Sequence, residues 1–486
     1  MTFSGCLRRW QDGGVDQQTV SNSVRDRWAN DVLPSLSGLV EIPALSPVFD
    51  KDWAKTGQLD AAIDHVKAWL AEREIPGAAI DVVRLGNRSP VLLLDVPATE
   101  GAEDKGTVLL YGHLDKQPPV GGWSDGLGPW KAVVEDGKLY GRGSADDGYA
   151  GYAATVAMEA LRANGGAHAR AVVLLETGEE SGSPDLPAYL EHLSDRLGEV
   201  TFVVCLDSGG NDYDRLWLTT SLRGLAQVHV TARVLDSAQH SGLASGVVPS
   251  SFRVLRNLIE RIENSATGEI LLAECNVEVP ANRREEIAAT AEVSPGGSRG
   301  TFPLNGSTRP VADDEIELLL GNSWRPTLSV IGASGFPEPA DAGNVLREAT
   351  TLALSFRLPP TADSASALAA IEKALTTDVP YSATIEITST EHADGWNAPA
   401  TAPWLADALG KVSDEVFGQP WRAVGLGGSI PFMGLLGEKY PRAQFLVTGA
   451  LGPDSNAHVP DEWLHLDQAR RVTEAVAHIL DAHARS

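Results

Sequence analysis

Four short apolar segments, at 107–113, 171–176, 200–205 and 443–448, restrict the fold of this chain more than any other feature of its sequence. Apolar runs of this length are typical of strands that are buried on both faces of a sheet. Each leads into a stretch that contains His, Asp or Glu. One polar residue after one strand would say little, because loops are usually polar. Since the carboxyl ends of strands line the crevice of an open α/β sheet, four such stretches predict a shared cluster.

The segments between these runs favour helices. The stretch 20–39 has helical character, and 58–72 repeats apolar residues at helical spacing. Strand patterns at 80–85 and 90–96 precede the run at 107–113. This alternation predicts an α/β fold in which a mixed sheet is flanked by helices.

A different pattern begins near residue 219. The stretch 225–234 alternates apolar and polar residues, as a strand with one wet face does, and helical and strand patterns follow up to about residue 391. The stretch 294–300 is rich in Gly, Pro and Ser and predicts an exposed loop. Because candidate cluster residues come from both ends of the chain, we predict one domain from 1–218 and 392–486, with an α+β domain inserted at 219–391.

Two adjacent carboxylates, Asp146 and Asp147, lie in a glycine-rich turn before a helical pattern. Either one could simply cap that helix, which is common for Asp. In the company of His113, Asp207 and His458, however, they predict a cluster of oxygen and imidazole ligands. Such a cluster suits Zn²⁺, Mn²⁺ or Co²⁺ better than metals that prefer thiolates.

Composition excludes several classes of function. The 486 residues include 39 basic and 65 acidic side chains, a formal charge of -26, which argues against nucleic acid or an anionic membrane as partner. No apolar run has transmembrane length, and the first residues lack the apolar core of a signal peptide, so we expect a cytoplasmic protein. Cys6, Cys205 and Cys275 are too scattered for a disulfide framework or a zinc ribbon.

Four motifs together resemble a known family. They are Tyr-Gly-His-Leu-Asp-Lys-Gln-Pro at 111–118, Asp-Gly-Lys-Leu-Tyr-Gly-Arg-Gly-Ser-Ala-Asp-Asp-Gly at 136–148, Glu-Thr-Gly-Glu-Glu-Ser-Gly-Ser at 176–183, and Gly-Gly-Ser-Ile-Pro at 427–431. In this order they resemble the M20 metallopeptidases, most closely the carnosinase-type (cytosolic non-specific) dipeptidases. The resemblance implies a zinc-peptidase-like catalytic domain, an inserted lid and dimerisation domain, a homodimer, and hydrolysis of dipeptides or short peptides. It also implies two divalent metal ions per subunit, zinc or manganese, with cobalt as a further candidate.

The resemblance assigns roles to residues at the matching positions. One metal would be held by His113 and Asp207, the other by Glu180 and His458, and Asp146 would bridge the two. Glu179 would be the general base. Asp115 would orient His113, and a carboxylate two residues along a strand suits that role.

Four residues nearer the C-terminus are candidates for substrate contact. His240 lies where family dimers lend a His to the substrate carbonyl, although a lone His in a polar loop is usually only a loop residue. Asn344 and Arg347 would hold a substrate carboxylate, since Arg suits bidentate pairing. Ser429 matches the family's substrate-contacting turn, with a plain tight turn as the alternative.

The chain departs from the family at three places. The family usually has Lys where Gly148 stands and Pro where Arg347 stands, and residues 263–325 match poorly. Asp rather than Glu at position 207 favours the dipeptidases and aminopeptidases of the family. An N-acyl-amino-acid amidohydrolase with the same metals remains an alternative function, and a metal-free binding protein is a more remote one. A serine hydrolase is a further alternative, but this chain lacks the Gly-x-Ser-x-Gly turn that would support it.

Overall fold

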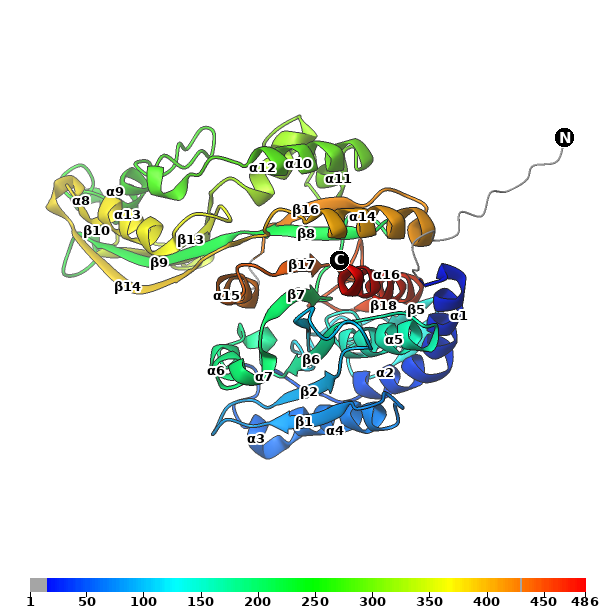
Figure 1. The fold of residues 1–486 in the computed structure, drawn as a ribbon. Coiled ribbons are helices and arrows are strands. Elements are labelled where there is room, and N and C mark those ends of the chain that lie inside the picture. The colour runs from blue at the N-terminus through cyan, green and yellow to red at the C-terminus, as the bar shows by residue number, and fades with distance from the viewer. Residues whose placement is uncertain (1–14, 429–430) are drawn as a thin grey trace. The chain divides into compact units, whose positions relative to one another are not determined.

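The structure is a computed structural model that describes residues 15–428 and 431–486 (Figure 1). The chain forms two compact units. The first comprises Met1–Thr219, Ala398–Ala423 and Leu435–Ser486, and the second comprises Thr220–Asn397 and Val424–Gly434. The predicted limits at 218/219 and 391/392 lie close to these breaks, but the second unit also takes in Val424–Gly434. That the second unit acts as a lid and dimerisation domain stays a prediction.

A six-stranded mixed sheet forms the centre of the first unit, with the strand order β1-β2-β6-β3-β7-β17. The strands β6, β3, β7 and β17 run parallel to one another. Strand β2 is antiparallel to both of its neighbours, β1 and β6. The strands of this unit are β1 (Ala79–Val83), β2 (Val91–Val96), β3 (Thr107–His113), β4 (Val133–Glu135), β5 (Lys138–Tyr140), β6 (Arg170–Glu176), β7 (Val200–Cys205), β17 (Gln444–Val447) and β18 (Trp463–His465). The four apolar segments therefore form the parallel part of the sheet, and the predicted α/β fold is confirmed.

Helices cover this sheet. Every residue of β3 is buried, as expected of a strand with both faces covered. Helix α5 packs on β3 and β6, and α16 packs on α5 (Figure 1). The helices of the first unit are α1 (Gln17–Arg27), α2 (Leu33–Val40), α3 (Trp53–Thr56), α4 (Gln58–Ala71), α5 (Ala150–Ala163), α6 (Leu186–His192), α7 (Ser194–Leu197), α14 (Pro403–Val412) and α16 (Leu466–Arg485), with π turns at Trp28–Val32 and Ser413–Phe417 and a 3₁₀ turn at Glu179–Ser181.

The second unit has its own core on an antiparallel four-stranded sheet of order β11-β13-β9-β14. Its elements are β9 (Gly224–Arg233), β10 (Gln239–His240), α8 (Ser241–Ala244), α9 (Ser251–Ile259), α10 (Ala281–Val293), α11 (Gly297–Gly300), α12 (Glu315–Ser323), β11 (Thr327–Ser334), β12 (Val345–Leu346), β13 (Ala349–Leu358), α13 (Ser364–Thr376), β14 (Thr384–Ala393) and β15 (Trp396–Asn397), with 3₁₀ turns at Ala273–Cys275, Pro339–Asp341 and Pro380–Ser382. Strands β8 (Trp217–Leu222) and β16 (Arg422–Leu426) and helix α15 (Pro431–Lys439) cross the limits between the units.

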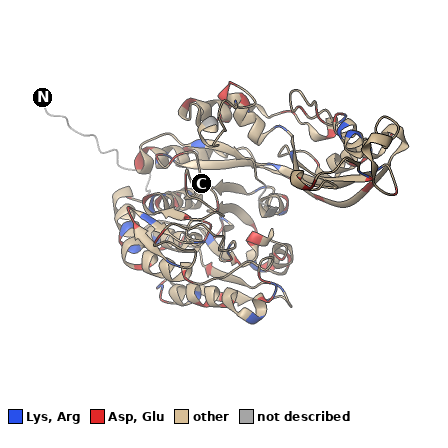
Figure 2. Cartoon of the chain, turned by 180° about the vertical axis from the view of Figure 1, so that it is seen from behind, with Lys and Arg blue, Asp and Glu red and all other residues tan. Residues whose placement is uncertain are grey.

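The Gly/Pro/Ser-rich stretch 294–300 is not wholly a loop, because its last residues form the single helical turn α11. Acidic residues occur on helices and loops of both units (Figure 2). Among the described residues, no helix has the length and apolar character needed to cross a membrane.

Candidate metal centre

The parallel strands bring ligand residues to one edge of the central sheet. Strand β3 ends at His113, and β6 leads through Thr177 and Gly178 into the turn that carries Glu179 and Glu180. Asp207 follows β7 by two residues. All three strands run parallel, so their carboxyl ends lie together.

The Asp146 turn, which we define as residues 141–148, supplies the next ligand. The peptide bond between Asp146 and Asp147 is cis. The turn lies so close to β3 that a Cβ on Gly112 would meet Asp147 Oδ2 at 2.9 Å. Neither Asp caps the following helix, since Tyr149 occupies the N-cap of α5 and makes no side-chain capping bond. The capping alternative is therefore wrong.

Two ligand groups share Asp146. His113, Asp146 and Asp207 form one, and Asp146, Glu180 and His458 form the other; within each group the candidate ligand atoms lie within 4.8 Å of one another. Asp146 Oδ1 lies 3.3 Å from His113 Nε2, and Asp146 Oδ2 lies 2.8 Å from His458 Nε2. The remaining distances are 3.8 Å from His113 Nε2 to Asp207 Oδ2 and 3.4 Å from His458 Nε2 to Glu180 Oε2.

Glu179 lies beside the cluster rather than within either group. Its Oε2 is 3.9 Å from His113 Nε2, and its side chain is largely buried. Burial, reinforced by the nearby Asp146 and opposed by His113, raises the pKa of Glu179 to about 7. A carboxyl group with a pKa near neutral pH can both accept and return a proton.

Asp115 contacts His113 through its backbone oxygen rather than through its carboxylate, which the sequence pattern did not predict. His113 Nδ1 lies 3.0 Å from the backbone oxygen of Asp115, whereas the Asp115 carboxylate is 3.6 Å away. This contact leaves Nε2 of a neutral His113 ring unprotonated and able to bind a metal. The carboxylate instead accepts the backbone N–H groups of Glu179 at 3.2 Å and Glu180 at 3.0 Å.

The electrostatics of the cluster fit bound cations. Burial and repulsion from Asp146 raise the pKa of Glu180 to about 10 and that of Asp207 well above its usual range. Burial would also raise the pKa of Asp146, but hydrogen bonds from His113 and His458 outweigh it and lower this pKa. Divalent cations would offset the cost of burying so many carboxylates, and carboxylate and imidazole ligands suit zinc or manganese.

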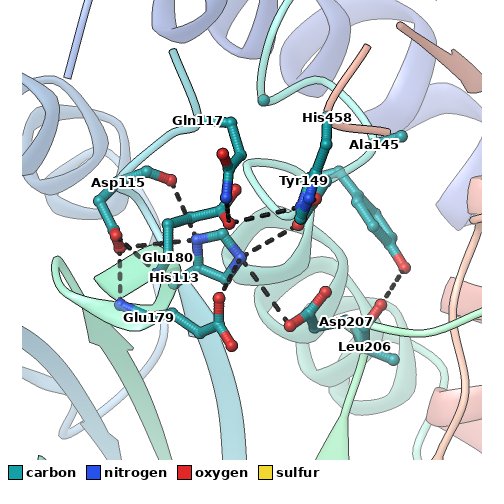
Figure 3. Close-up of polar contacts among 12 residues, drawn as sticks. His113, Asp115, Gln117, Ala145, Tyr149, Glu179, Glu180, Leu206, Asp207 and His458 are labelled. Carbon is teal, nitrogen blue, oxygen red and sulfur yellow. Dashed lines mark hydrogen bonds and ion pairs between the residues drawn. The ribbon is translucent and has the colours of Figure 1, made fainter. Parts of the chain in front are cut away.

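Gln117 is a site residue that the sequence analysis missed. Its Nε2 donates to Glu180 Oε2 at 2.6 Å (Figure 3). The only signal in the sequence is its place four residues after His113, in the segment that leaves β3. Two further residues that support the ligand loops, Arg142 and Glu462, were also missed and are considered below.

Three of the substrate-contact candidates lie together in the second unit. His240 in β10 pairs with Val345 in β12, and Ser241 N donates to Asn344 O at 2.8 Å. Arg347 directly follows β12. Gly242 N donates to His240 Nδ1 at 3.1 Å, so a neutral His240 ring carries its proton on Nε2. Their roles stay predictions, and Ser429 lies outside the described residues.

Comparisons with known proteins show similarity to peptidases. The model of peptidase family M20/M25/M40 matches residues 109–482. A cysteinylglycine-S-conjugate dipeptidase of Corynebacterium striatum is 27% identical over 390 residues, which cover 78% of this chain and 82% of that protein. The human Beta-Ala-His dipeptidase is 30% identical over 254 residues, 51% of this chain and 49% of that protein. The structure of the dipeptidase Dug1p from Saccharomyces cerevisiae, 20% identical, has a TM-score of 0.72 and covers 97% of this chain and 99% of that one, which shows the shared fold.

Proposed function

This chain belongs to peptidase family M20/M25/M40 and is a metallopeptidase, and on that premise we propose that it hydrolyses the peptide bond of dipeptides or short peptides with two divalent metal ions. One observation carries the proposal: the two carboxylate oxygens of Asp146 face His113 and His458, which belong to different ligand groups. A shared carboxylate between two groups is the arrangement of a two-metal hydrolytic site.

The protein's own groups divide the work of hydrolysis. His113 and Asp207 would hold one ion, Glu180 and His458 the other, and Asp146 both. Bound there, the ions would supply Lewis acidity to polarise the scissile carbonyl and to lower the pKa of a water molecule. Glu179 takes a proton from the attacking water as its oxygen bonds to the carbonyl carbon, and returns a proton to the leaving amine as the C–N bond breaks.

The sequence resemblance implies that residues of the second unit contact the substrate. A proton on His240 Nε2 makes this residue a donor to the oxyanion that forms at the carbonyl oxygen when water adds to the carbonyl carbon. Asn344 and Arg347, which directly precede and follow β12, would hold the carboxylate of the substrate. Ser429 is proposed as a further contact from the sequence resemblance alone.

We propose a dipeptidase in preference to an N-acyl-amino-acid amidohydrolase. Asp207 supports this choice, as do the names of the two relatives, both of which are dipeptidases. A cytoplasmic location is proposed from the resemblance to the cytosolic enzymes of this family.

A homodimer through the second unit is also proposed. Strand β11 is an outer strand of the sheet β11-β13-β9-β14. It exposes 54% of Val330 and 57% of Ile331, an apolar edge that a second copy of the chain would cover by pairing its own β11. Leu243 and Val247, after β10, are each 82% exposed in the same unit.

The test is to measure metal content and turnover on one preparation of the protein. Unblocked dipeptides and N-acetyl amino acids are assayed before chelation, after it, and with Zn²⁺, Mn²⁺ or Co²⁺ added back. Two ions per chain with metal-restored cleavage of unblocked dipeptides is the expected result. Cleavage of N-acetyl amino acids alone would favour the amidohydrolase, and cleavage that survives chelation would contradict a metal mechanism.

A further inference from the structure

A buried ion pair joins the two loops that carry Asp146 and His458. Arg142 Nη1 lies 2.6 Å from Glu462 Oε2, and the two side chains are 1% and 0% exposed. Arg142 belongs to the Asp146 turn. Glu462 directly follows residues 452–461, which we call the His458 loop.

The Glu462 carboxylate also shapes the Asp146 turn. Its Oε1 lies within hydrogen-bonding distance of three backbone N–H groups of the turn, those of Gly143 at 2.9 Å and of Ala145 and Asp146 at 3.3 Å. The backbone oxygen of Glu462 accepts the N–H of Gly141 at 3.0 Å. One residue beyond the His458 loop thus fixes the path of the turn that presents the bridging carboxylate.

Arg142, a residue of the Asp146 turn, in return supports the His458 loop. Its Nη2 donates to the backbone oxygen of Val459, next to His458, at 3.1 Å. The His458 loop needs such support, because four residues in it that are not glycine have positive φ: Asp454 at 61°, Asn456 at 58°, His458 at 67° and Asp461 at 62°. Residues with a side chain disfavour this conformation, Asn and Asp less than the others, so contacts from outside the loop help to maintain it.

We propose that Arg142 and Glu462 are positioning residues that set the distance between Asp146 and His458, and with it the affinity of the metal site formed by Asp146, Glu180 and His458. This inference rests on the proposed two-metal site. The pair has less influence on the site formed by His113, Asp146 and Asp207, because His113 and Asp207 come from strands β3 and β7.

A second ion pair in the chain, which contacts neither ligand loop, serves as a matched control for the pair of Arg142 and Glu462. Arg470 and Glu474 form a second ion pair, in which Glu474 is buried to 2% exposure, but both residues lie on helix α16. Glu474 also accepts Ser21 Oγ at 3.1 Å. Loss of this pair should lower stability without changing either metal site.

The experiment is a calorimetric titration of the chelator-treated full-length protein with Zn²⁺, in the absence of substrate. Glu462→Gln keeps the size of the side chain but removes its charge. It should weaken one of the two zinc sites by about 10- to 100-fold, the usual effect of losing support behind a ligand. In an Asp207→Asn background, which leaves the site of Glu180 and His458, the same weakening is expected. In a Glu180→Gln background the change should be clearly smaller, and Glu474→Gln should titrate as the wild type.

Arg142→Lys covers the case in which Glu462→Gln does not fold. Lysine keeps the positive charge but lacks the fork that reaches both Glu462 and the Val459 oxygen, so it should weaken the same site. Wild-type zinc affinities in either folded variant, or equal weakening of both sites, would overturn the inference. A wild-type protein that binds no zinc would instead overturn the proposed function itself.

Discussion

Gln117 Nε2 donates a hydrogen bond to Glu180 Oε2 at 2.6 Å. This bond fixes the position of the carboxylate oxygen that also faces the candidate ligand His458. Burial disfavours the charged form of Glu180, so a donor from outside the ligand set favours the ionised carboxylate. The bond also orients Oε2 toward His458, which lies 3.4 Å away.

We therefore expect Gln117→Leu to weaken metal binding by about tenfold, the low end for a residue that supports a ligand. Zinc titration of the metal-free protein measures the effect. Gln18→Leu, on the exposed side of α1, is the control, and it should leave the titration unchanged. Equal affinities in the Gln117 variant and the wild type would show that Glu180 keeps its position without this bond.

Glu179 and Glu180 should separate catalysis from metal binding. We expect Glu179→Gln to lower kcat by about 10²- to 10⁴-fold, as loss of a general base does, and to retain both metal ions. Glu180→Gln should lose one ion as well as activity, because Glu180 belongs to a ligand group and Glu179 does not. Metal analysis and dipeptide kinetics on the same preparations check both, with the exposed Glu191→Gln as control. Metal loss in Glu179→Gln would mean that the two roles are exchanged.

Asp146 and Asp207 should differ in how many ions they control. Asp146 belongs to both ligand groups and Asp207 to one. Accordingly, Asp146→Asn should abolish tight binding of both ions, whereas Asp207→Asn should leave one ion bound. Metal content after gel filtration distinguishes these outcomes, with the solvent-exposed Asp81→Asn as control. Two ions retained in Asp146→Asn would exclude a bridging role.

Candidate ligand residues could be predicted from the sequence where they end or follow an apolar strand, because parallel strands end at the same edge of a sheet; for Asp146 the signal was the glycine-rich turn. His113 and Asp207 are examples, at the ends of β3 and β7. The supporting residues could not be predicted in this way. The contact between Arg142 and Glu462 joins positions 320 residues apart, and no local pattern indicates it. For Asp115 the spacing suggested the carboxylate as the partner of His113, but the ring meets the backbone oxygen instead.

The proposed dimer predicts that a charge on β11 separates the subunits. Ile331→Glu places a carboxylate on the exposed apolar edge, where burial against a second copy would be costly. We expect the wild type to have twice the mass of one chain in light scattering and Ile331→Glu to have the mass of one. Val134→Glu, at a position in the first unit with 51% exposure, should remain dimeric.

If His240 acts across the dimer, the monomeric Ile331→Glu variant should also lose activity while keeping its metals. A wild-type protein with the mass of one chain would contradict the proposal.

His478 should make the fold sensitive to acid. It lies buried in α16, and burial lowers its pKa to about 4 against the opposing effect of Asp481. In the unfolded chain the pKa of His is about 6.5, so between pH 6.5 and 4 the unfolded state binds more protons and stability falls as pH falls. From pH 7 to pH 5 this residue alone should remove about 2 kcal/mol from the free energy of unfolding.

Urea unfolding at pH 7, 6 and 5 measures how steeply the free energy of unfolding depends on pH. This dependence should be flatter in His478→Gln, even though that variant is less stable at pH 7. The exposed His192→Gln should follow the wild-type slope, and parallel curves for His478→Gln and the wild type would show that His478 is not the group that takes up the proton.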